Sequence, residues 1–159
     1  MLVDLEGLCG SAEASEPIMS EEEERQLVVK EQVQAIINDT SHVPSNYRSK
    51  LDDLYNKGKV IYEPVYMRPL SRWSNKTYYA YGTSDLKDSP SGEFIRVTKA
   101  VWMDFSGYVK QAVRHVLIHE LRHIMLNCRY HIGDGQSCIK RNENKGAFDN
   151  VLETWGYYK

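Results

Sequence analysis

The chain has 159 residues, of which 42% are hydrophobic and 26% are charged, and its formal net charge is −2. This composition indicates one soluble globular domain and excludes a disordered or fibrous protein. The charge provides no broad basic field for nonspecific attraction to nucleic acid, and no apolar run approaches the roughly 18 to 20 residues of a membrane span. The N-terminus is acidic where a secretory signal is basic and then apolar, so we expect a cytoplasmic protein with no membrane partner.

The N-terminal part of the chain predicts a flexible arm followed by a helix. Residues 1–19 mix small, acidic and apolar residues without a period, whereas residues 20–159 are expected to form a single domain. Ser20 and Glu23 have the spacing of a capping box, which predicts a helix over about residues 20–38.

The middle of the chain predicts one more helix and then a small sheet. Residues 45–59 place apolar side chains on one face and contain Gly58 as a stop signal, which predicts a second helix. Three segments rich in β-branched and aromatic residues predict three strands, at residues 59–67, 76–83 and 93–101.

Apolar residues recur at spacings of three and four from about residue 106 to 127, which predicts a buried helix. Residues 129–138 predict a loop and residues 142–156 a closing helix that ends near Gly156. The helices and strands together predict an α+β fold, with helices packed on a small twisted sheet.

The predicted buried helix contains the sequence HELRH, from His119 to His123. Residues four apart lie on one face of a helix, so both imidazoles are in reach of a single zinc ion. Glu120 follows the first histidine, where a carboxylate can act as the general base for a zinc-bound water. The alternative is a structural cluster of buried polar side chains that satisfy one another by hydrogen bonds.

HELRH, with Val116 before it and Met125 after it, resembles the signature of the zincin metallopeptidases. Residues 60–156 resemble the SprT-like minimal zincins, including small phage and bacterial members, in their order of strands, motif helix and closing helix. The resemblance implies a minimal zincin-like fold, a Zn²⁺ cofactor and hydrolysis of protein or peptide substrates. Arg122 is charged where the signature prefers uncharged residues, so its guanidinium is expected to point away from the metal.

A catalytic zinc commonly has three protein ligands. The third histidine of the SprT-like family precedes a phenylalanine, which Phe148 matches here, but Glu143 and its neighbours stand in the place of that histidine. We therefore predict His119, His123 and Glu143 as the ligands. The alternatives for the third position are His131, Asp149 and Glu153.

Several other residues are weaker candidates. His115 lies one turn before His119, but three successive histidines turn too far around a helix to face one ion, so His115 is expected beside the site or at the surface. Tyrosines that could donate to a developing oxyanion are Tyr130, Tyr157 and Tyr158, although surface packing is the commoner role.

The cysteines are Cys9, Cys128 and Cys138, which cannot all pair within one chain, so reduced thiols are expected. A disulfide between Cys128 and Cys138 remains an alternative, because the two residues are ten apart and the loop between them contains glycine. A separate metal cluster of Cys128, His131 and Cys138 is a further alternative, although it lacks a paired CxxC motif.

The sequence thus predicts a zinc-dependent metallopeptidase of the HExxH type, in which an edge strand at residues 93–101 pairs with an extended substrate. The alternatives are a noncatalytic zinc-containing module for phage or host interactions, and an effector or toxin protease with a specific host target. The SprT-like resemblance also implies DNA as a partner, for which the basic residues are Arg68, Arg72, Lys76, Lys140, Arg141 and Lys145.

Overall fold

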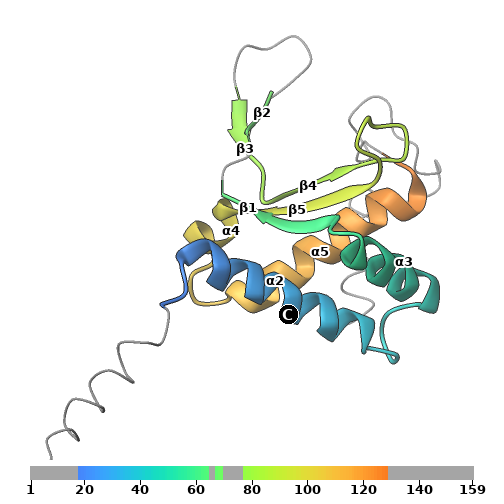
Figure 1. Ribbon diagram of the computed structural model, residues 1–159, viewed down its shortest axis with the longest axis horizontal. Helices are drawn as coiled ribbons and strands as arrows, with labels where there is room; N and C mark the ends of the chain where they lie inside the picture. The colour runs from blue at the N-terminus through green and yellow to red at the C-terminus, as the bar shows by residue number, and fades with distance from the viewer. Residues whose placement is uncertain (1–17, 65–66, 70–76, 129–159) are drawn as a thin grey trace, which may run out of the picture.

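The computed structural model describes residues 18–64, 67–69 and 77–128, with residues 67–69 and 77–79 described by their backbone alone. Figure 1 shows two layers, in which a sheet lies on one side and helices lie on the other. The described helices are α2 (Glu21–Ile37), α3 (Ser45–Asn56), α4 (Lys99–Asp104) and α5 (Val109–Leu126). The described strands are β1 (Val60–Glu63), β2 (Met67–Pro69), β3 (Thr77–Tyr79), β4 (Gly82–Asp85) and β5 (Phe94–Thr98).

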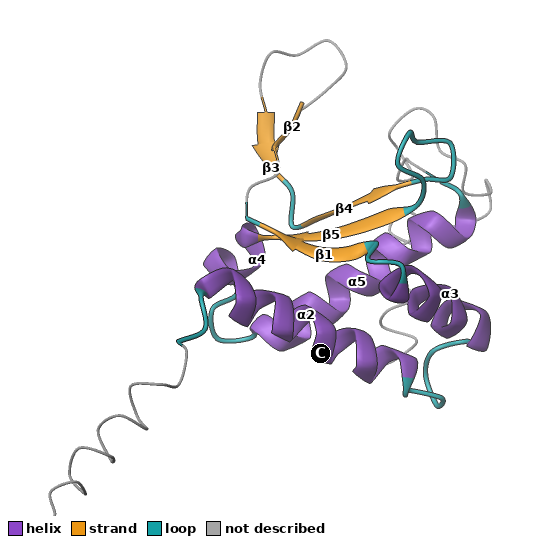
Figure 2. Cartoon of the chain, in the orientation of Figure 1, coloured by secondary structure: helices purple, strands orange, loops and turns teal. Residues whose placement is uncertain are grey.

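The predicted α+β class is confirmed, and so are the three helices that fall within the described residues (Figure 2). The capping box at the start of α2 is complete, because the Ser20 hydroxyl accepts from the Glu23 N–H and the Glu23 carboxylate accepts from the Ser20 N–H. Gly58 follows α3 with a φ of +73°, a left-handed conformation that glycine adopts without strain, and so ends the helix as predicted.

The predicted strands are wrong in their boundaries. The segment 59–67 contains β1 and the start of β2, and Pro64 follows β1, where its missing N–H prevents a further ladder bond. The segment 76–83 is likewise divided between β3 and β4. The end of the segment 93–101 is helical, because the Thr98 hydroxyl caps α4 by accepting from the Ala100 N–H.

Strand β5 lies in the centre of a three-stranded mixed sheet with the order β1-β5-β4, while β2 and β3 form a separate antiparallel hairpin. β5 is parallel to β1 and antiparallel to β4. The expectation that residues 93–101 form the edge strand of a cleft is therefore wrong. Within the described part of the chain, β1 and β4 are the edges.

One of these edges is covered by α2. The Tyr62 N–H on β1 donates to the side-chain oxygen of Gln26 at 2.8 Å, so α2 occupies a hydrogen-bonding position that an added strand would use. β4 lies over α5 instead, the helix that contains HELRH (Figure 1).

The core lies between the sheet and the helices α2, α3 and α5. Ile95 and Val97 project from β5 onto this layer, and Leu117 and Leu121 of α5 are fully buried beneath them. Arg114 of α5 donates to the Gln32 side chain of α2 at 2.9 Å, which joins the two helices beside the core. Burial of one face of α5 therefore sets which of its side chains face β4.

Several predictions lie outside the described residues: most of the flexible arm, the loop at 129–138 and the closing helix at 142–156. None of the helices in the described ranges has the length and apolar character that a membrane crossing requires. Cys128 is disulfide-bonded, so the expectation of reduced thiols is wrong for Cys128. A structural disulfide is unusual in the cytoplasm of most organisms, and the cytoplasmic location stays a prediction.

Candidate metal centre

Helix α5 brings the two histidines of HELRH together on one face. The Nε2 atoms of His119 and His123 lie 3.3 Å apart, and the ring centroids are 5.0 Å apart with an interplanar angle of 69°. His123 is 5% exposed and His119 is half-buried, so the pair lies at the boundary between core and solvent. The spacing of four residues and the burial of the neighbouring apolar face together produce this convergence.

The separation of the two nitrogens fits a zinc ion. Zinc binds imidazole nitrogen at about 2.0 to 2.1 Å in a tetrahedral arrangement, which places two such nitrogens about 3.3 to 3.4 Å apart. Without a metal, the same 3.3 Å distance fits a hydrogen bond from His119 Nε2–H to His123 Nε2. The two imidazole nitrogens are therefore spaced as two zinc ligands would be. The metal content of the purified protein distinguishes a bound zinc ion from a hydrogen bond between the two rings.

The end of α5 sets the tautomer of His123. Asn127 ends the helix in the left-handed conformation, with a φ of 50°, and the chain turns back so that the Cys128 N–H donates to the His123 carbonyl at 2.9 Å. The Cys128 carbonyl oxygen lies 2.6 Å from His123 Nδ1. Since a carbonyl can only accept, Nδ1 carries the proton and Nε2 of the neutral ring presents its lone pair. Histidines that bind metals commonly have such a backbone partner.

Glu120 faces strand β4. Its side chain is 7% exposed, and Oε1 accepts a hydrogen bond from the Ser84 hydroxyl at 2.9 Å. Burial of a carboxylate is unfavourable without such bonds, so β4 is part of what makes this position of Glu120 stable. Ser84 was not among the predicted site residues, although Gly82 within a strand signals the close approach of another element.

His115 and Arg122 lie beside the pair without joining it. The His115 ring stacks on His119 at a centroid distance of 6.4 Å and an interplanar angle of 14°. Arg122 donates to the Tyr47 hydroxyl of α3 at 3.3 Å, in agreement with the expectation that its guanidinium points away from the histidines. Within residues 18–64, 67–69 and 77–128, no group of three histidine, cysteine or acidic side chains is placed to hold a metal.

The predicted third ligand, Glu143, lies outside the described residues. The same holds for the alternatives at that position and for the candidate tyrosines, namely His131, Asp149, Glu153, Tyr130, Tyr157 and Tyr158. It holds also for the side chains of the basic residues considered for DNA, namely Arg68, Arg72, Lys76, Lys140, Arg141 and Lys145. The third ligand and the DNA contacts stay predictions.

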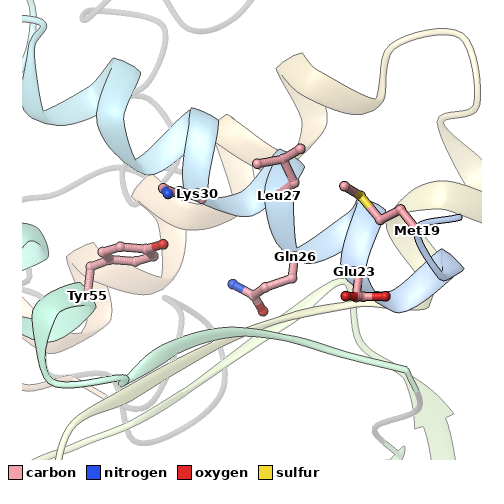
Figure 3. Close-up of a pocket in the computed structure, with 6 residues that line it drawn as sticks. All are labelled: Met19, Glu23, Gln26, Leu27, Lys30 and Tyr55. Atoms are coloured by element: carbon pink, nitrogen blue, oxygen red, sulfur yellow. The ribbon is translucent and has the colours of Figure 1, made fainter. Parts of the chain in front are cut away.

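A hollow in the surface is lined by residues at and near the start of α2 and by one residue of α3 (Figure 3). Its lining residues are Met19, Glu23, Gln26, Leu27, Lys30 and Tyr55. None of them belongs to α5, and the hollow contributes nothing to the histidine pair.

Comparison of the chain with protein families, with curated proteins and with solved structures finds no match.

Proposed function

We propose that this protein is a zinc-dependent metallopeptidase in which His119 and His123 bind the metal and Glu120 is the general base. The observation that carries the proposal is the 3.3 Å separation of the two Nε2 atoms, which fits the distance between two ligands of one tetrahedral zinc. The Nδ1–H of His123 is held by the Cys128 carbonyl, which supports the same role by directing the Nε2 lone pair toward the metal position.

Each group has a distinct role in the proposed reaction. Zinc bound there would supply the Lewis acidity that activates water and polarises a peptide carbonyl at neutral pH. Glu120 follows the first ligand in the helix and takes a proton from the attacking water, then passes it to the leaving amine. Glu143 remains our proposal for the third ligand, and the SprT-like, minimal zincin-like fold is part of the same proposal.

The strand that pairs with an extended substrate is proposed to be β4. β4 lies over α5, and its residue Ser84 contacts Glu120, so a peptide added along this edge would pass the general base. The opposite edge is unsuitable, because Gln26 of α2 already accepts from the β1 backbone at Tyr62. DNA binding is not included in the proposal, because the side chains considered for it lie outside the described residues.

Metal content of the purified protein tests the ligand pair. The wild type is expected to contain about one zinc ion per chain, and the double variant His119→Ala, His123→Ala is expected to contain almost none. His115→Ala is the matched control, since it removes a histidine one turn away on the same helix and should leave the zinc content unchanged. Equal zinc in the wild type and the double variant would refute the metal site.

Glu120→Gln separates an enzyme from a noncatalytic zinc module. The amide cannot accept the proton, so peptide hydrolysis should fall by a factor of about 10² to 10⁴ while zinc content stays the same. A set of unfolded and peptide substrates, followed by mass spectrometry, measures the loss. If the variant hydrolyses these substrates as fast as the wild type, Glu120 is not the general base.

A further inference from the structure

The contact between Ser84 and Glu120 joins two elements that are far apart in the sequence. Ser84 lies on β4 and Glu120 lies in the middle of α5, and the hydroxyl donates to Oε1 of the carboxylate at 2.9 Å. Both residues are largely removed from solvent, since Glu120 is 7% exposed and Ser84 is half-buried. A hydrogen bond to a charged acceptor in such a place is among the stronger polar contacts of a protein.

Gly82 makes this contact possible. It lies two residues before Ser84, on the same face of β4, and a Cβ built at this position would overlap Cγ1 of Val116 and lie 3.2 Å from Cγ of Glu120. The missing side chain thus lets the strand approach α5 closely. Serine has a short side chain, so its hydroxyl reaches the carboxylate only because the two backbones are this close.

We propose that Ser84 is a positioning residue for the general base, in an inference that rests on the proposed function. The Ser84 hydroxyl holds one oxygen of the Glu120 carboxylate and so restricts its rotation. The carboxylate is then in place for proton transfer before a substrate binds, which lowers the reorganisation needed in the reaction. Because Ser84 lies on the strand proposed to pair with substrate, the same contact sets the distance between the Glu120 carboxylate and a peptide bound along β4.

Three variants of β4 test the proposal. Ser84→Ala removes the hydroxyl and should lower kcat on the order of 10- to 100-fold, with KM and zinc content unchanged. Ser84→Thr keeps a hydroxyl and should restore most of the rate. Thr83→Val is the matched control: its neighbouring hydroxyl is buried, has no hydrogen-bond partner within the described ranges, and should be dispensable.

A second readout does not depend on hydrolysis. The side-chain carboxyl carbon-13 resonance of Glu120, assigned by its loss in Glu120→Gln, should move in Ser84→Ala at constant pH and stay in place in Thr83→Val. This measurement is made on the full chain with and without added zinc.

The possible results separate the two proposals. A wild type without hydrolysis overturns the proposed function, and the positioning role falls with it. An active wild type with an unchanged rate in Ser84→Ala overturns the positioning role alone, whether or not the resonance moves. An equal fall in kcat in Thr83→Val would also overturn it, because that result indicates a general defect of β4. A large rise in KM in Ser84→Ala would overturn it too, because that result indicates a role in substrate binding.

Discussion

Replacement of Gly82 with alanine tests how closely β4 packs on the motif helix. The added methyl group would overlap Cγ1 of Val116 and lie 3.0 Å from the carbonyl oxygen of Arg96 on β5. Nonbonded carbon atoms pack at about 3.5 to 4.0 Å, so Cγ1 of Val116 is too close for the new carbon, and the Arg96 carbonyl oxygen makes the position tight on its other side. β4 is hydrogen-bonded to β5 and rests on α5, so it must move away from at least one of them.

Overpacking of this kind typically costs about 1 to 3 kcal/mol in the free energy of unfolding. For a domain of this size, such a loss corresponds to a fall in Tm of roughly 2 to 12 °C. Urea denaturation followed by circular dichroism gives the free energy directly. Gly107→Ala is the control, because a Cβ at Gly107 would meet nothing within 4 Å, and its effect should be within about 0.5 kcal/mol.

Gly82→Ala in a protein that also carries Val116→Ala tests whether the overlap with Val116 causes the loss of stability. Val116→Ala removes Cγ1, the atom that the new methyl group would overlap, so Gly82→Ala should cost less in that background than in the wild type. Two results would refute the reasoning. One is a Gly82→Ala protein as stable as Gly107→Ala, and the other is a cost that Val116→Ala does not reduce.

Two further predictions concern local hydrogen bonds. Ser20→Ala removes the N-cap of α2 and should lower the free energy of unfolding by about 1 kcal/mol in urea denaturation. Hydrogen bonds with Ser20, first of all from its backbone N–H, lower the pKa of Glu23. Their stabilising effect is present above the ordinary carboxyl range and is lost as the pH falls through the lowered pKa, so the difference in stability between the wild type and Glu23→Gln should shrink in acid. The hydrogen bond from Tyr81 to Asp104 raises the pKa of Tyr81, so its stabilising effect is present below the ordinary tyrosine value of about 10 and is lost as the pH rises through the raised pKa. Ultraviolet titration of tyrosinate should show a step for Tyr81, assigned by its loss in Tyr81→Phe, that moves to lower pH in Asp104→Asn.

The helices were the most predictable part of the fold. The capping box at Ser20, the stop at Gly58 and the apolar period of α5 are local signals, and α2, α3 and α5 each begin and end within a few residues of their predicted bounds. The strands were less predictable, because a strand is stabilised by partners far away in the sequence. The run ending in Val101 shows this: its strand-forming residues continue into α4, where Thr98 acts as a helix cap.

In the candidate site, too, the local features could be predicted from the sequence and the contacts between distant segments could not. Convergence of His119 and His123 follows from a spacing of four residues on a helix, which sequence alone determines. The Ser84 contact was beyond reach, since no local pattern shows which strand packs against which turn of α5.

Sequence by itself therefore determined the helices α2, α3 and α5, the α+β class and the pair of imidazoles on one helix face, because hydrogen bonding and side-chain periodicity within a helix are local. Only the tertiary structure decided that β5 is central, that α2 covers the β1 edge and that β4 lies over Glu120. The physical reason is that strand order and the packing of sheet on helix depend on contacts between distant segments, which the chain settles only by burying its core as a whole.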